Sequence, residues 1–223
     1  MATPKYTKVV VIQDNDTLDS GGETEVAVIG GRGAKVVSGT HGLAYAGAGG
    51  QAKVVRYGIA IAGPKGKAMG GAGCVVCAYE GGSASGGDGS TAWARRHGPA
   101  TTGAFGMAIA NDSDATGGRA SVASVTCRTA MKATAHAASE GIAVVRSHPD
   151  LDPASRLATA YSTTGGIAVA FDGNSVKGDV GALLVAAYKN DGQIRFAVGV
   201  VDNVTLMANQ TYTCDTNGAF VAV

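Results

Sequence analysis

The chain reads GLAYAGAG, GQAKVVRY, GIAIAGPK and GKAMGGAG over residues 42–73. Glycine therefore recurs every eight residues, at Gly42, Gly50, Gly58 and Gly66, and alanine follows two places later each time. A unit of this length is too short for a helical repeat but suits one short strand and one turn. The period predicts a β-solenoid, in which each strand pairs with its copy in the next coil.

Side chains alternate across a strand, so each unit turns one set toward the core and the other toward the surface. Gln51 and Lys53 are polar and are expected to face water, which places Ala52 and Val54 in the core. The same phase predicts a thin core of Ala, Val and Gly, which agrees with 35 glycines and an aromatic content of only 5%. The recurring glycines are expected to permit the positive φ of the sharp turns.

The outward positions alternate between apolar and polar pairs from one unit to the next. If two units form one coil of about 16 residues, all the apolar pairs lie on one side of the solenoid. Soluble proteins rarely expose a large apolar patch, so this side is expected to be covered. Three alternatives remain for what covers it: another part of the same chain, further copies of the chain, or a different protein. The predicted apolar outer face consists of Leu43, Tyr45, Ile59, Ile61, Met107, Ile109, Ile142, Val144, Ile167 and Val169.

Composition divides the chain into five predicted segments. The last is a small antiparallel cap, because Asp191-Gly192 is a hairpin signal between two strand-like runs. The third is a flexible Gly/Ser-rich link, which is either a long turn or a hinge. The segments are an N-terminal strand and cap (1–20), a first solenoid array (21–80), the link (81–90), a second, irregular array (91–180) and the antiparallel cap (181–223).

Charge and composition argue against several classes of partner. The formal net charge is +1, so the chain lacks the basic stripe that nucleic-acid binding needs. It also lacks the run of about 20 apolar residues that a membrane span needs. No apolar signal segment is recognised at the N-terminus, so the expected location is the cytoplasm, or a virion if the chain is of phage origin.

The sequence holds no recognisable catalytic or metal-binding pattern. Its four histidines, at positions 41, 97, 136 and 148, belong to no HExxH, GxSxG or Walker pattern. The aspartates at 112 and 114 are expected to be solvated turn residues, because they supply too few ligands for calcium. Cys74, Cys77, Cys127 and Cys214 are expected to be small buried thiols. The chain is therefore predicted not to be an enzyme and to bind no cofactor or metal ion.

Two places on the surface are predicted to contact a protein partner. The first is Trp93 with Arg95 and Arg96, because aromatic and arginine side chains often dominate the binding energy of interfaces. Packing of Trp93 against the Gly/Ser-rich link is the alternative. The second is a loop bounded by two prolines, residues 147–153, with His148, Asp150 and Asp152.

Three stretches carry a resemblance to known proteins: Gly42–Gly73, Gly165–Ala170 and, most specifically, Gly181–Val223. The chain resembles a group of bacterial and phage proteins whose short Ala/Gly β-solenoid repeats end in a Gly-Ala-Leu strand and a hairpin sheet. More distantly, the Gly-x-Ala units resemble the β-roll heads of trimeric autotransporter adhesins, where an apolar face lines the trimer.

The resemblance implies an all-β fold and no particular reaction. Some solenoid proteins of this kind are immunity partners of secreted toxins, so the resemblance favours a protein-binding, toxin-neutralising function. The alternative is a structural or adhesive component of a phage virion or bacterial surface fibre, which would trimerise through the apolar outer face.

Overall fold

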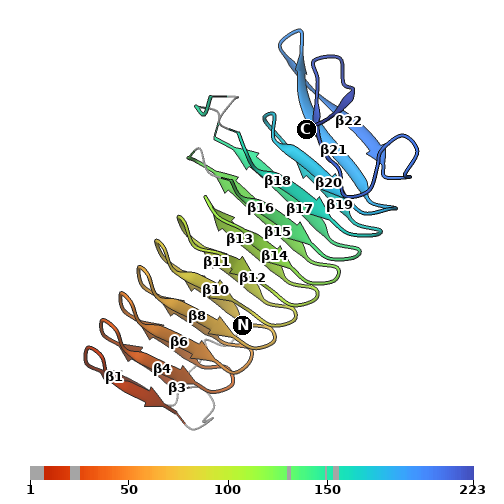
Figure 1. Ribbon diagram of the computed structural model, residues 1–223. Helices are drawn as coiled ribbons and strands as arrows, with labels where there is room; N and C mark the ends of the chain where they lie inside the picture. Colours follow the sequence, from red (N-terminus) through yellow and green to blue (C-terminus); the bar gives the residue numbers. More distant parts are fainter. Residues whose placement is uncertain (1–7, 21–25, 130–131, 149, 153–155) are drawn as a thin grey trace. The chain divides into compact units, whose positions relative to one another are not determined.

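The structure, a computed structural model, describes residues 8–20, 26–129, 132–148, 150–152 and 156–223. These residues are arranged as strands and turns without any helix, so no helix among them could cross a membrane. The chain falls into two compact units, Met1–Gly106 and Met107–Val223, which we call unit 1 and unit 2. Each unit is a β-solenoid of stacked parallel strands, which confirms the predicted all-β fold (Figure 1).

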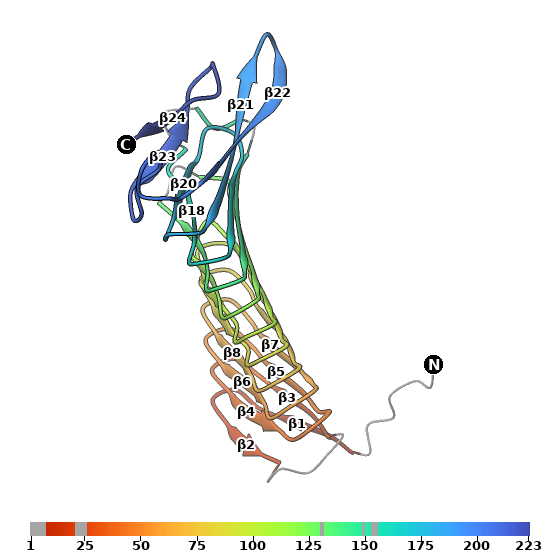
Figure 2. The ribbon, with the colours of Figure 1, turned by 90° about the vertical axis from the view of Figure 1, so that its right-hand side faces the viewer.

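Unit 1 consists of two parallel sheets that face each other, and each coil adds one strand to either sheet (Figure 2). Paired residues in neighbouring coils, such as Leu43 and Ile59, are 16 positions apart, so two eight-residue units make one coil. We name the sheets after the numbers of their strands. The odd sheet of unit 1 contains β1 (Lys8–Ile12), β3 (Val26–Gly30), β5 (Leu43–Ala46), β7 (Ile59–Ala62), β9 (Val75–Ala78) and β11 (Thr91–Ala94), and the even sheet contains β2 (Thr17–Asp19), β4 (Lys35–Ser38), β6 (Gln51–Val54), β8 (Lys67–Gly70), β10 (Ser83–Ser85) and β12 (Ala100–Thr101).

The N-terminal residues that the structure describes add a coil to unit 1, and its strands pair with residues 18 positions further along the chain. Strand β1 pairs in parallel with β3, and β2 pairs in parallel with β4. Residues 1–7, which belong to the predicted cap, lie outside the described residues. The first predicted segment therefore contributes strands to both sheets.

The core of unit 1 is built from small side chains in two facing layers. Valine in one layer meets glycine in the other: a Cβ added to Gly70 would lie 2.7 Å from Cγ2 of Val76. Larger side chains would force the sheets apart, which explains the thin core. The core positions predicted from the strand phase are confirmed, because Ala44, Ala46, Ala52, Val54, Ala60, Ala62 and Ala68 are all buried.

The recurring glycines do not supply the positive φ that we expected of them. The residue before each glycine does so instead: His41, Tyr57 and Lys65 have φ angles of 58°, 51° and 57°. The glycine that follows lies against the previous coil, and a Cβ on Gly58 would lie 2.3 Å from the carbonyl oxygen of Gly42. Close approach of two coils, and not the turn itself, therefore requires glycine at these positions.

Residues 81–90 are a regular part of unit 1, and their prediction as a flexible link is wrong. They contain β10, which pairs with β8 at the usual spacing of 16 residues. Positive φ angles at Gly81 and Gly89 continue the eight-residue series of turns. The N–H groups of these two glycines donate to the carbonyls of Arg96 and Ala104 in the next coil, at 2.7 and 2.8 Å. Backbone hydrogen bonds between coils thus order a segment whose composition is typical of flexible chain.

Unit 2 has the same two-layer plan with coils of unequal length. Partners along its odd sheet are 15, 20, 25 and 16 positions apart, at residues 107, 122, 142, 167 and 183. The insertions that lengthen these coils follow β15 and β17, where the chain passes from the odd sheet to the even sheet. The odd sheet contains β13 (Met107–Asn111), β15 (Val122–Cys127), β17 (Ile142–Ser147), β19 (Ile167–Ala170), β21 (Leu183–Asn190) and β22 (Gln193–Val200), and the even sheet contains β14 (Ala115–Gly117), β16 (Thr134–Ala137), β18 (Thr159–Ser162), β20 (Ser175–Gly178), β23 (Thr211–Cys214) and β24 (Phe220–Ala222).

The C-terminal segment forms two antiparallel ribbons, where the sequence predicts one small sheet (Figures 1 and 2). Strand β21 pairs in parallel with β19 and antiparallel with β22, so the first ribbon extends the odd sheet. Strand β23 pairs antiparallel with both β20 and β24, so the second ribbon extends the even sheet. The predicted turn at Asp191-Gly192 is confirmed. Between the ribbons, the side chains of Leu206 and Phe220 lie against Gly199.

Candidate functional site

The outer face of the odd sheet in unit 1 carries two columns of side chains, most of them apolar. One column runs from Leu43 through Ile59 and Val75 to Thr91, and the other runs from Tyr45 through Ile61 and Cys77 to Trp93. The exposed fractions of Tyr45, Val75 and Trp93 are 38%, 51% and 42%. The described residues of unit 1 therefore do not themselves cover this face. On the outer face of the even sheet, the positions in register are mainly polar, with Lys35, Gln51, Lys53, Lys67, Ser83 and Ser85.

Trp93 is part of this apolar face, and the alternative that it packs on residues 81–90 is not supported. The guanidinium of Arg95 lies 5.8 Å from the ring centroid of Trp93 and 5.7 Å from that of Tyr79. These contacts have the geometry of cation–π interactions. Arg96 lies apart from them in a turn, with a φ of 48°. Tyr79 was not predicted as a contact residue, although it precedes Arg95 by 16 positions, which is one coil.

In unit 2 the apolar outer face extends over more strands of the odd sheet than it does in unit 1. The positions predicted from the sequence, at residues 107, 109, 142, 144, 167 and 169, do point outward from it. The register of the paired strands adds further outward residues that the sequence analysis did not include. One outer column consists of Met107, Val122, Ile142, Ile167, Leu183 and Val200, and its neighbour consists of Ile109, Ser124, Val144, Val169, Val185 and Val198.

The second predicted contact region lies in unit 2, after β17. Nδ1 of His148 is 3.2 Å from Oδ2 of Asp150, and both side chains are exposed, as is Asp152. Arg156 fastens the loop by donating two hydrogen bonds to the carbonyl of Leu151, at 3.0 and 3.2 Å. Pro149 and Pro153 lie outside the described residues. The described residues of the loop thus present an exposed polar pair, His148 and Asp150.

A polar cluster lies on the outer face of the even sheet in unit 2. His136, Tyr161 and Lys177 occupy successive strands in register. The rings of His136 and Tyr161 stack with centroids 4.8 Å apart, and the ammonium of Lys177 lies 5.4 Å from the Tyr161 centroid. The Tyr161 hydroxyl donates to Oδ1 of Asp179 at 3.0 Å. This arrangement links three coils side by side.

His136 is expected to make the stability of the protein depend on pH. Burial lowers the pKa of His136 against a smaller opposing effect of the Asp179 charge, and Nε2 is buried with no hydrogen-bond partner among the described residues. The unfolded chain, with a histidine pKa near 6.5, therefore binds this proton more readily than the folded chain does. The stabilisation is complete above about pH 6.5 and is lost as the pH falls through the lower folded pKa. His136→Phe keeps the stacked ring and should lose less stability than the wild type between pH 7.5 and 5 in urea titrations.

The matched control is Tyr161→Phe, which leaves the imidazole in place and should keep the pH dependence of the wild type. If His136→Phe and the wild type lost the same stability on acidification, His136 would not be the group responsible.

The other titratable groups are spread over the surface and the core. His41 stacks on Tyr57, with ring centroids 5.6 Å apart. Asp112 is buried and not solvated as predicted, because Oδ1 accepts hydrogen bonds from the N–H groups of Arg128 and Thr129. Within the described residues, no three His, Cys, Asp or Glu side chains lie close enough together to hold a metal ion.

The four cysteines are free thiols, and two of them are in the core as predicted. Burial raises the pKa of Cys127 to about 11, and the charges of Asp112 and Asp114 act in the same direction. Cys77 and Cys214 are only half-buried, so their prediction as core residues is wrong. Cys77 occupies an outward position because it pairs with Ile61 and Trp93 in the apolar column.

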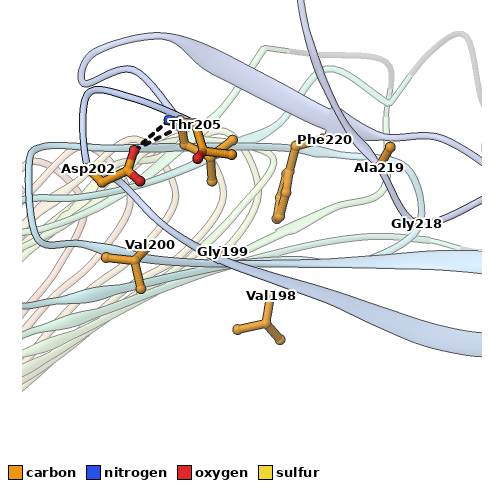
Figure 3. A pocket seen from close by; sticks show the side chains of 9 residues that line it. Val198, Gly199, Val200, Asp202, Thr205, Gly218, Ala219 and Phe220 are labelled. Atoms are coloured by element: carbon orange, nitrogen blue, oxygen red, sulfur yellow. Dashed lines mark hydrogen bonds between the residues drawn. The ribbon is translucent and has the colours of Figure 1, made fainter.

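An open cavity of about 510 Å³ lies between β22 and the ribbon that follows it (Figure 3). Its lining is apolar or backbone apart from Thr205 and Asp202. Oδ1 of Asp202 accepts hydrogen bonds from three backbone N–H groups, at 2.8, 2.7 and 3.2 Å, and these bonds lower the pKa of Asp202. The carboxylate therefore stabilises its own turn, and no second titratable group faces it from the cavity lining.

The most extensive feature of the described surface is thus the apolar outer face of the odd sheets. No family model matches the chain, and neither a curated protein nor a solved structure shows significant similarity to it. The functional argument consequently depends on the exposed side chains and their geometry.

Proposed function

We propose that this protein is a non-catalytic, protein-binding β-solenoid that holds its partner on the apolar outer face of unit 1. The observation that carries the proposal is the pair of exposed columns that ends at Trp93 and Arg95. Contiguous apolar surface of this kind marks interaction sites in soluble proteins. Tryptophan, tyrosine and arginine are the side chains that most often dominate binding energy, and all three meet at this end of the columns.

The scaffold supports this role because it is already ordered before a partner arrives. Most turns of unit 1 donate a backbone hydrogen bond to the next coil, as Tyr57 does to Ala72 at 3.0 Å. Binding to such a surface costs little conformational entropy in the backbone. The polar outer face of the even sheet favours contact with water, so a partner is expected on one side of unit 1 only.

The narrower proposal is that the partner is a toxin and that the protein acts as an immunity-type protein. It rests on the resemblance to bacterial and phage solenoids with short Ala/Gly repeats, some of which neutralise secreted toxins. An immunity protein needs tight association and no chemistry of its own, which agrees with an interface built around an aromatic and arginine cluster.

A structural or adhesive role in a phage virion or bacterial surface fibre is the second candidate. The apolar columns run in register through successive coils of each unit, and three copies of such a face could line a trimer as in the adhesin heads. Light scattering separates the two roles. A stable trimer in solution would favour the structural role, whereas a monomer or dimer favours the binding module.

Partner binding should depend on the odd sheet and not on the even sheet. Tyr45→Lys combined with Ile61→Lys, and separately Trp93→Ala, should weaken binding of a partner captured from the native host by about 30-fold or more. The matched control is Val37→Lys combined with Met69→Lys, which adds the same two charges to the outer face of the even sheet and should bind as the wild type does. If the control and the odd-sheet variants bound equally well, the odd sheet would not be the contact surface.

A further inference from the structure

Strand β22 is the last strand of the odd sheet in unit 2, and its two faces differ. Its inner face is covered toward the C-terminal end, because Ala197 is buried and Gly199 lies against Leu206 and Phe220. Figure 3 shows Val198 and Val200 on the opposite side of the strand from Phe220. The outer face is apolar and open, with exposed fractions of 53–63% for Ile194, Phe196, Val198 and Val200.

The same four residues direct their backbone groups to the free edge of β22. The N–H of Val201 donates to Ala182, and its carbonyl accepts from Gly181, so Val201 faces the β21 side of the strand. Residues along an antiparallel strand alternate between its two edges. Val200 and every second residue before it therefore present N–H and C=O groups away from β21. Beyond this edge the described part of the chain places no further strand.

Natural proteins usually protect an exposed edge with proline, lysine, an inward charge or a bulge. The register of β21 with β22 is regular from Leu183–Val200 to Asn190–Gln193, so it contains no bulge. Residues 193–200 contain no proline, lysine or acidic residue, and Arg195 is their one charged side chain. An unprotected, apolar edge of this length is suited to pairing with another strand.

We propose that β22 pairs antiparallel with β22 of a second copy of this chain, about a twofold axis at Ala197. In this register Phe196 lies opposite Val198 of the other copy, and Ile194 lies opposite Val200. Arg195 lies opposite Gly199, so no charge meets a like charge. The strand is thus complementary to itself in both charge and apolar pattern.

The pairing supplies an interface of modest size. Alternation gives four residue pairs and so about eight backbone hydrogen bonds across the axis, close to the number in a typical interface. The side chains that meet are four half-exposed apolar groups from each copy, which bury less than the roughly 800 Å² per partner of a standard interface. The expected dimer is therefore one that forms and dissociates with concentration.

Sedimentation of the full chain over about a hundredfold range of concentration tests the proposal. The wild type should pass from monomer to dimer. Val198→Pro removes an N–H from the free edge without touching the hydrogen bonds to β21, and it should remain monomeric. Val198→Lys places a charge opposite the apolar Phe196 of the other copy and should do the same, which keeps the test valid if the proline variant fails to fold.

Two controls separate edge pairing from other contacts. Val204→Lys changes an exposed valine in the loop after β22, and this variant should still form a dimer. Val144→Lys lies on the apolar face away from the edge, and loss of the dimer in this variant would indicate stacking of faces instead. A wild type that stays monomeric, or a dimer that persists in both Val198 variants, would overturn the proposal. The outcome of the sedimentation experiment does not depend on whether unit 1 binds a partner protein.

Discussion

Ala60→Leu is expected to lower the free energy of unfolding by about 3 kcal/mol or more, because overpacking a dense core forces rotamers and backbone to shift. Ala60 is fully buried and lies in register between Ala44 and Val76, so neither neighbouring coil leaves space for three further carbon atoms. Valine and glycine already meet closely between the facing layers. Urea denaturation followed by circular dichroism should show a lower midpoint than for the wild type.

The matched control is Ile59→Leu, one position away on the same strand, where the side chain is exposed. That variant should unfold within about 0.5 kcal/mol of the wild type, as surface substitutions commonly do. If Ala60→Leu and Ile59→Leu unfolded at the same urea midpoint, the core would have space for a leucine, contrary to the packing described above.

Gly98→Ala is expected to have a comparable effect, about 3 kcal/mol, for a different reason. The added Cβ would lie 1.7 Å from the carbonyl oxygen of Gly82 and 2.8 Å from its carbon. Both atoms belong to the backbone of the previous coil, so no flexible side chain can move aside. The two coils would have to separate, which weakens the hydrogen bonds between them. Thermal unfolding should show the loss directly.

Gly89→Asn is the control for Gly98→Ala. Gly89 has a φ of 64°, and a Cβ added to it would lie in open space. Asparagine tolerates this backbone conformation better than most residues do. The variant should lose less than about 1 kcal/mol. If Gly89→Asn lost as much stability as Gly98→Ala, the turn conformation and not the stacking of coils would explain the regular spacing of glycine along the chain.

These two predictions concern the same physical limit. Because the strand layers are this close, the core has no free space for a larger side chain. One enlarged coil therefore displaces the coils stacked on it. Substitutions on the outer faces avoid that limit. The surface variants proposed for the odd sheet and for β22 should therefore change binding or association while the fold is retained.

The fold class, the inward positions and the difference between the two outer faces follow from the amino-acid sequence alone. It could do so because side-chain alternation and an eight-residue period are local properties that any strand of this length must obey. The alternation of Ala52 with Lys53 is enough to assign one residue to the core and the other to the surface. The spacing of Leu43 and Ile59 likewise follows once two units are taken as one coil.

Features that depend on contacts between coils became visible only in the folded molecule. Composition made residues 81–90 look flexible, but their backbone groups are paired with the coils on either side. The role of Gly58 is set by the Gly42 carbonyl, which is 16 positions away in the chain and adjacent in space. Val122 joins an outer column after a coil of 15 residues, and Val198 joins the other through the antiparallel pairing of β22 with β21. The register of stacked strands is set by hydrogen bonds between residues that are far apart in the chain. A local sequence pattern therefore cannot predict this register where insertions make the coils unequal in length.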